Sequence, residues 1–233
     1  MRTEAGSLEP NRSRSIALPA TAALVGLPYL AFAELNGWFN PALFQASPLA
    51  FWLVDSIFNV LLPLFGAWLL ARFSGARPAS YGLAFPPPLL KELLGATLFF
   101  GLVLFLAYFI PQRIAWLSLG RPAPSFSYGQ VLPTGMLRIL ADFYLAVTAG
   151  LVESVVYIGL PWLLWRRLLG ASRRELFCLA SATLFASVHW EQGPHAMLGS
   201  LVFGYVACGV YLKIGDLWPI VGAHIAIDAV AFW

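Results

Sequence analysis

The most restrictive feature of the sequence is a series of seven apolar runs separated by short polar or proline-rich segments. An apolar run of about 20 residues is long enough for a helix to cross the hydrocarbon core of a bilayer. We expect membrane spans at residues 16–33, 49–71, 89–110, 136–165, 174–190, 195–213 and 217–233. No ten-residue alternating pattern repeats along the sequence, which argues against a β-barrel. The sequence therefore predicts an all-α, polytopic membrane bundle of about seven transmembrane helices.

The distribution of basic residues predicts how this bundle is oriented. If the N-terminus is cytosolic, eleven of the fourteen Lys and Arg residues fall on the cytosolic side, and the opposite side keeps Arg113, Arg121 and Arg138. Lys and Arg concentrate in cytoplasmic loops, so we expect the N-terminus inside and the C-terminus outside. The polar residues 1–15 are expected in the cytosol, and residues 16–233 as one membrane-embedded domain.

Composition fits a location in the lipid bilayer rather than on nucleic acid. The chain is 60% hydrophobic and 11% charged, and its net charge of +3 is accounted for by membrane topology. We expect an integral protein of a prokaryotic cytoplasmic (inner) membrane, with lipid as its surroundings and no nucleic-acid partner. Residues 111–135, rich in proline and glycine, are expected to form the larger external loop.

A few ionisable residues lie inside the apolar runs, where they are costly and usually mark a site. They are Asp55, Asp142, Glu153, His189, His224 and Asp228. Glu153 lies near the middle of its run, either as a functional group or as a neutral acid hydrogen-bonded to a neighbouring helix. His224 and Asp228 are four residues apart, so they share a helix face. Either they satisfy each other or the aspartate orients the imidazole for chemistry.

Taken together, these residues predict a hydrolytic site if their three runs converge. A glutamate can activate water as a general base, histidine can stabilise the developing oxyanion, and aspartate can orient the histidine. Glu153, His189 and His224 are also legitimate zinc ligands. The sequence has no HExxH motif, however, so we expect no cofactor and keep zinc as an alternative.

Three short motifs carry a family resemblance. They are "ESVVYIG" at 153–159, "FASVH" at 185–189 and "HIAID" at 224–228. Their order and spacing resemble the CPBP family (CAAX protease and bacteriocin-processing), also called the ABI family, whose motifs take the forms EExxxR, FxxxH and HxxxN or HxxxD. The resemblance extends over residues 136–233, which it identifies as the catalytic core.

The resemblance implies a CAAX-type intramembrane endopeptidase. Such an enzyme would hydrolyse a peptide bond near the anchored end of a membrane protein or peptide that is lipidated or carries a C-terminal sorting helix. The catalytic residues it implies are Glu153, His189, His224 and Asp228. The neighbouring residues expected to support them are Ser154, Tyr157, Phe185 and Glu191.

Two positions depart from the family pattern. Ser154 stands in the place of the second glutamate, and Ile158 in the place of the arginine. These departures leave open a catalytically silent member that acts as a membrane-binding, scaffold or bacteriocin-immunity protein. A proton-coupled transporter would explain carboxylates within the membrane but not three motifs in register.

Overall fold

The computed structural model describes residues 42–84, 90–120 and 132–232, together with parts of 19–35. Helices account for 88% of the structure, and no strand occurs in the described residues, so the predicted all-α class is confirmed. The polar segment 1–15 lies outside the described residues.

Several consecutive helices join end to end into two long rods. The first rod consists of α2 (Pro48–Ser56), the π-helix η1 (Ile57–Leu61), α3 (Leu62–Leu69) and the π-helix η2 (Leu70–Ser74). The second consists of α5 (Met136–Glu153), the π-helix η5 (Ser154–Gly159) and α6 (Leu160–Leu169). The other elements are the 3-10 helix η3 (Pro78–Tyr81), α4 (Leu90–Leu119), α7 (Arg174–Ser187), the 3-10 helix η6 (Trp190–Gln192), α8 (Pro194–Ile214) and α9 (Trp218–Phe232).

Four of these helical stretches are long and apolar enough to cross a membrane: Pro48–Phe73, Lys91–Leu119, Met136–Leu169 and Pro194–Ile214. A shorter apolar stretch, Trp218–Ala231, belongs to α9. The protein is therefore an integral membrane protein. The count of about seven spans and the N-in/C-out orientation stay predictions.

The expected external loop at residues 111–135 is wrong over its first third, because α4 continues through Pro111 to Leu119. Proline can stay inside a membrane helix when neighbouring groups satisfy the freed backbone. Packing holds this end of α4 in place: Ala115 is buried, and the Trp116 ring lies 6.1 Å from that of His195 on α8. Contacts with another helix thus outweigh the local stop signal of the proline.

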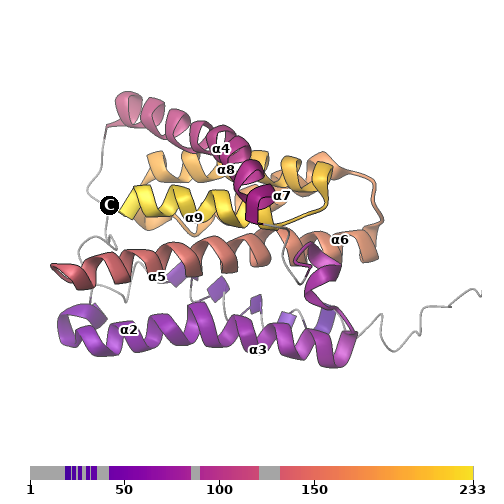
Figure 1. The fold of residues 1–233 in the computed structure, drawn as a ribbon, viewed down its shortest axis with the longest axis horizontal. Coiled ribbons are helices and arrows are strands. Elements are labelled where there is room, and N and C mark those ends of the chain that lie inside the picture. The colour runs from indigo at the N-terminus through magenta and orange to yellow at the C-terminus, as the bar shows by residue number, and fades with distance from the viewer. Residues whose placement is uncertain are drawn as a thin grey trace, which may run out of the picture.

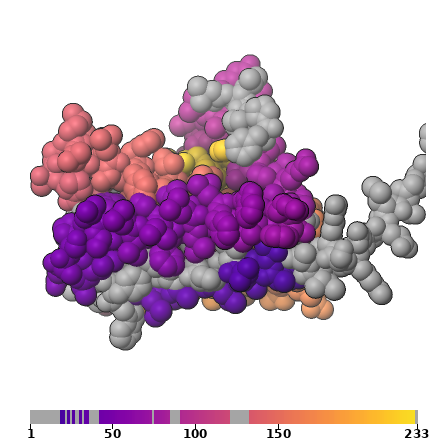
Figure 2. Space-filling model, turned by 90° about the horizontal axis from the view of Figure 1, so that it is seen from below, coloured from indigo at the N-terminus to yellow at the C-terminus, as the bar shows by residue number. Residues whose placement is uncertain are grey.

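The helices pack as a bundle in which the rod of α2 and α3 lies beside the rod of α5 and α6 (Figure 1). Helix α5 packs on α9, α7 packs on α8, and α4 packs on both α8 and α9. Seen from below, α2 and α3 cover one face, and atoms of α9 are visible between α5 and α4 (Figure 2). Helix α9, which carries His224 and Asp228, is therefore enclosed by α4 and α5.

A glycine sets the closest approach between α5 and α9. A methyl group added at Gly150 would stand 2.8 Å from the backbone nitrogen of Ile225, closer than such atoms pack. The two backbones therefore cross in direct contact three residues before Glu153 and one residue after His224. This crossing brings the two side chains together from distant parts of the chain.

Candidate active site

The backbone changes from α-helix to π-helix immediately after Glu153, which is the last residue of α5. π-Helical turns inside α-helices are rare and are frequent at functional sites. Within η5, Ser154, Tyr157 and Ile158 are all buried. The wider turn thus directs these three side chains of the first motif into the interior of the bundle.

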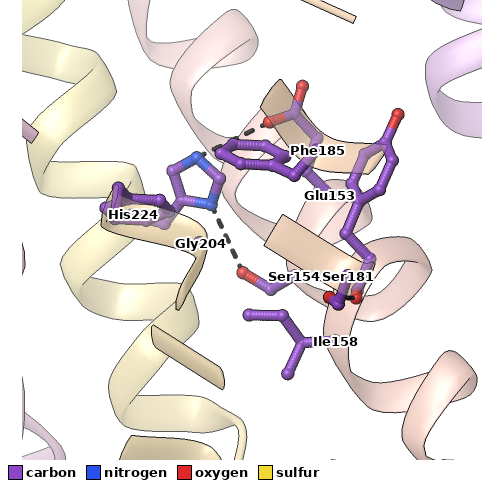
Figure 3. Close-up of a pocket in the computed structure, with 9 residues that line it drawn as sticks. Glu153, Ser154, Ile158, Ser181, Phe185, Gly204 and His224 are labelled. Atoms are coloured by element: carbon purple, nitrogen blue, oxygen red, sulfur yellow. Dashed lines mark hydrogen bonds and ion pairs between the residues drawn. The ribbon is translucent and has the colours of Figure 1, made fainter. Parts of the chain in front are cut away.

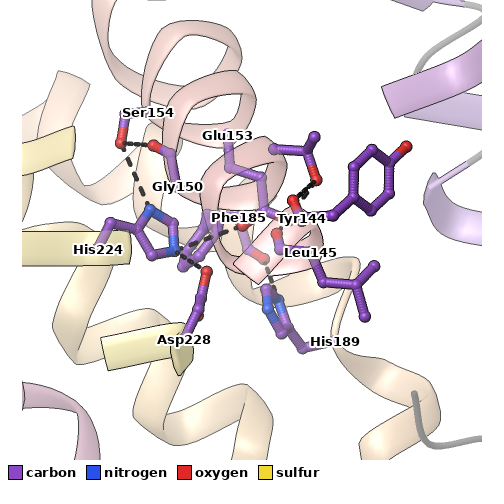
Figure 4. Close-up of polar contacts among 10 residues, drawn as sticks. Tyr144, Leu145, Gly150, Glu153, Ser154, Phe185, His189, His224 and Asp228 are labelled. Carbon is purple, nitrogen blue, oxygen red and sulfur yellow. Dashed lines mark hydrogen bonds and ion pairs between the residues drawn. The ribbon is translucent and has the colours of Figure 1, made fainter. Parts of the chain in front are cut away.

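His224 is the centre of the polar contacts (Figure 4). Its Nε2 atom lies 3.6 Å from Glu153 Oε2 and 3.5 Å from Asp228 Oδ2. The His224 side chain is 6% exposed, whereas those of Glu153 and Asp228 are 21% and 17% exposed. One ring nitrogen is therefore shared between two carboxylates, one from α5 and the other from one turn further along α9.

The opposite ring nitrogen of His224 faces Ser154. The Nδ1 atom lies 3.4 Å from Ser154 Oγ, and the serine hydroxyl donates a 2.6 Å hydrogen bond to the carbonyl oxygen of Gly150. Figure 3 shows the imidazole between the Glu153 carboxylate and the Ser154 hydroxyl. The two consecutive residues of the first motif therefore hold His224 from both sides.

His189 lies near this group without direct contact to it. Helix α7 ends at Ser187, so His189 stands in the turn before η6 rather than inside the helix. Its Nδ1 donates a 2.9 Å hydrogen bond to the Phe185 carbonyl oxygen, which leaves Nε2 as the acceptor of the neutral ring. The Phe185 ring lies 4.8 Å from the His189 ring and 5.8 Å from the His224 ring. Phe185 thus separates the two histidines, which still interact electrostatically.

A small pocket opens beside these groups, with an empty volume of about 220 Å³. Its lining residues come from η5 and its neighbours: Glu153, Ser154, Tyr157, Ile158, Ser181, Phe185, Phe203, Gly204 and His224. The closed part of the pocket has room for about one water molecule. The residues that line this pocket include both Glu153 and His224.

The four expected supporting residues have different positions. Ser154, Tyr157 and Phe185 line the pocket, whereas Glu191 does not. Glu191 is buried in η6, where the Gln192 amide donates a 3.4 Å hydrogen bond to its carboxylate, and it interacts electrostatically with Glu153. Burial raises the pKa of Glu191 to about 7.

Sequence reasoning missed a pair of residues on α4. The Gln112 amide donates a 3.2 Å hydrogen bond to the Tyr108 hydroxyl, and Tyr108 interacts electrostatically with Asp228 and Glu153. Its ring packs edge-on against Phe203, whose ring lies 4.8 Å from that of His224. The signal in the sequence is a tyrosine and a glutamine four residues apart in an apolar helix, which is weak because neither residue is charged.

Two other ionisable residues expected in the spans have their own partners. Asp142 pairs with Arg138 one turn earlier at 3.7 Å. Asp55 accepts a 2.8 Å hydrogen bond from Asn59 and a 3.4 Å hydrogen bond from Tyr144. Neither aspartate lines the pocket.

Glu153, His189 and His224 are the residues of the zinc alternative, and zinc binding by them stays untested. Within the described part of the chain, no three His, Cys, Asp or Glu residues are grouped so that they could hold a metal ion. The Glu153 carboxylate contacts His224, while Nδ1 of His189 is bound to a backbone carbonyl.

An all-helical membrane protein with carboxylates and imidazole beside a water-sized pocket belongs to the class of candidate intramembrane hydrolases. Residues 135–230 match the family described as Rce1-like, type II CAAX prenyl endopeptidase Rce1-like. This match covers all three motifs and supports the resemblance to the CAAX protease family that they carry. No match was found among curated proteins, and none among solved structures.

Proposed function

We propose that the protein is an intramembrane endopeptidase that cleaves a peptide bond near the membrane-anchored end of a protein or peptide. The observation that carries this proposal is the pair of carboxylates on Nε2 of His224, next to a pocket of water size. The family match over residues 135–230 supports the same reaction class.

The geometry suits a reaction in which water is the nucleophile. Glu153 takes a proton from the water as its oxygen attacks the scissile carbonyl carbon. The oxyanion that forms accepts a hydrogen bond from Nε2–H of the doubly protonated His224 ring. His189, whose ring packs on Phe185 in the wall of the pocket, is the residue assigned to position the water as it enters. The carbon–nitrogen bond then breaks, and the proton held by Glu153 passes to the leaving amine. Asp228 holds the His224 ring throughout.

The two departures from the family pattern are compatible with activity. Ser154 and Ile158 line the same pocket and are both buried. Losing one member of a buried ion pair leaves an uncompensated charge, but replacing both members with neutral residues does not. The loss of glutamate and arginine together is therefore compatible with a stable fold. Retention of Glu153, His189, His224 and Asp228 favours an enzyme, whereas Ser154 and Ile158 are the features that favour a catalytically silent scaffold or immunity protein.

The proposal also includes a cellular setting. We place the protein in a prokaryotic cytoplasmic membrane, where it acts without a cofactor on a lipidated substrate or one with a C-terminal sorting helix. The fold and the family match support the membrane location and the protease class.

Cleavage in reconstituted vesicles tests the proposal. The purified protein would be given a farnesylated peptide ending in a CAAX sequence and, separately, a transmembrane peptide, with product identified by mass spectrometry. We expect cleavage by the wild type and a loss of about 10²-fold or more in Glu153→Gln and in His224→Ala. Glu92→Gln, at an exposed carboxylate on α4, is the matched control and should remain active. Activity that persists in both site variants would refute the assignment.

The catalytic type needs a separate measurement. We expect full cleavage after dialysis against a chelator, together with no stoichiometric zinc by elemental analysis. Loss of cleavage on chelation, restored by zinc, would instead establish the metal alternative. Absence of any cleavage, with specific capture of a membrane partner, would favour the scaffold alternative.

A further inference from the structure

We propose that Ser154 is a positioning residue that keeps a proton on Nδ1 of His224, so that Nε2 alone exchanges protons with the carboxylates. The serine stands where the family pattern has a glutamate, and the role follows from its contacts in this chain.

The first step is the direction of the serine proton. A hydroxyl has one proton to donate and lone pairs that accept. Ser154 is 1% exposed, and its Oγ lies 2.6 Å from the carbonyl oxygen of Gly150, an atom that can only accept. The serine proton is therefore committed to this carbonyl.

The second step fixes the state of the histidine nitrogen. Because the Ser154 hydroxyl donates its proton to the Gly150 carbonyl oxygen, only its lone pair faces His224 Nδ1, at 3.4 Å. A hydrogen bond along this line requires a proton on Nδ1. The neutral His224 ring would then carry its proton on Nδ1 and a lone pair on Nε2.

The third step concerns the other side of the ring. Nε2 lies 3.6 Å from Glu153 Oε2 and 3.5 Å from Asp228 Oδ2. Within the described residues, Asp228 Oδ2 is buried and makes no hydrogen bond. A second proton can lie on Nε2 or on one of the two carboxylates. When this proton is on Nε2, the nitrogen is a hydrogen-bond donor; when it is on a carboxylate, Nε2 is an acceptor. Ser154 thus keeps one proton on Nδ1, while the second proton moves between Nε2 and the carboxylates.

The contact that fixes Ser154 is tied to the packing of the bundle. Gly150, which accepts the serine proton, is also the glycine at which α5 meets α9 beside Ile225. The backbone that orients the hydroxyl is therefore held by the helix that carries His224. The distance between Ser154 Oγ and His224 Nδ1 is therefore set by how closely α5 and α9 cross.

Nitrogen-15 spectra of the histidine rings test the inference directly. The chain has three histidines, so the signals of His224 can be assigned by substituting His189 and His195. In the wild type reconstituted in vesicles, we expect Nδ1 of His224 to show the shift of a protonated nitrogen. Ser154→Ala should redistribute this proton toward Nε2, and Ser154→Thr, which keeps the hydroxyl, should restore the wild-type spectrum.

Ser181→Ala is the matched control, because Ser181 is a buried serine of the same pocket whose hydroxyl donates to the Tyr157 carbonyl. It should leave the His224 spectrum unchanged. A bare Nδ1 in the wild type, or a wild-type spectrum in Ser154→Ala, would overturn the inference.

The kinetic arm rests on the proposed function. We expect Ser154→Ala to lower kcat about tenfold with little change in KM, the size expected for one hydrogen bond, and Ser154→Thr to recover most of it. If the spectra behave as expected but the wild type cleaves nothing, the proposed function fails and the assignment of Ser154 stands. If the wild type cleaves but Ser154→Ala leaves the spectrum unchanged, the assignment fails alone.

Discussion

Two buried acidic clusters lie along the same helix, α5, and they use their carboxylates differently. The Asp55 cluster joins Asp55, Ser56 and Asn59 of the first rod to Tyr144 of α5. The His224 cluster joins Glu153 and Ser154 to His224 and Asp228 of α9. Both place acidic side chains inside an apolar bundle.

Burial and hydrogen bonding both distinguish the two clusters, since the Glu153 and Asp228 side chains are 21% and 17% exposed. Asp55 is only 2% exposed, and neutral donors satisfy both of its oxygens, at 2.8 Å from Asn59 and 3.4 Å from Tyr144. In the His224 cluster the contacts to the ring are longer, 3.4–3.6 Å, and a pocket adjoins them. A buried carboxylate with neutral donors stabilises a fold, whereas carboxylates that share one imidazole beside a pocket retain proton-transfer capacity.

The largest expected effect comes from removing the base. Glu153→Gln keeps the shape of the side chain but cannot take a proton, so cleavage should fall by about 10²–10⁴-fold. Asp55→Asn, the same change in the other cluster, should leave the cleavage rate near that of the wild type. Rates on one reconstituted substrate compare them. Equal losses in both variants would remove the distinction between the clusters.

A charge introduced into the pocket of the His224 cluster should be the next largest effect. Ile158 is 4% exposed, so Ile158→Arg buries an unpaired cation and should lower the free energy of unfolding by about 3–5 kcal/mol. Adding Ser154→Glu restores a partner on the same pocket and should recover part of the loss. Denaturant unfolding in detergent measures both variants. A double variant no more stable than Ile158→Arg would show that the two positions do not compensate.

The Asp55 cluster should affect stability rather than catalysis. Asp55→Ala leaves the partly buried donors of Asn59 and Tyr144 without this acceptor and should cost about 1–3 kcal/mol of unfolding free energy. Tyr144→Phe removes a single weaker contact and should cost less. Unfolding and cleavage are measured on the same preparations. A loss of cleavage that exceeds the loss of folded protein would make Asp55 part of the site.

The last expected effect is a pH dependence from Glu191. Its pKa is about 7 in the folded protein against 4.5 ordinarily, because burial disfavours the charged form. The unfolded chain therefore releases this proton first, and stability contributed by the protonated group declines as the pH rises from 4.5 to 7. Glu191→Gln should flatten this decline and be more stable than the wild type above that range. Melting temperatures across the range provide the check, and parallel curves would contradict it.

The sequence predicted those parts of the site that depend on charged residues at helical spacing. His224 and Asp228 share a face because they are four residues apart, and the structure places them on the same side of α9. Their convergence with Glu153 depended on the family motifs, because spacing alone says nothing about helices 70 residues apart. The catalytic roles of these residues stay predictions.

The parts that escaped prediction depend on packing or on neutral residues. Tyr108 and Gln112 carry no charge, so an apolar helix conceals them. Pro111 suggested the end of a helix, but contacts between α4 and α8 extend the helix by eight residues beyond it. His189 was expected at the end of a span, and it stands in a turn because α7 stops two residues earlier.

The direct backbone contact at Gly150 has a mechanical consequence. It places a pivot about 4.5 Å along α5 from Glu153 and about 21 Å from the start of the helix at Met136. A scissor rotation of about 10° around this pivot would displace Glu153 by about 0.8 Å and the distant end by nearly 4 Å, at 1.5 Å per residue. Any such rotation would therefore change the spacing at the outer end of α5 several times more than the position of Glu153.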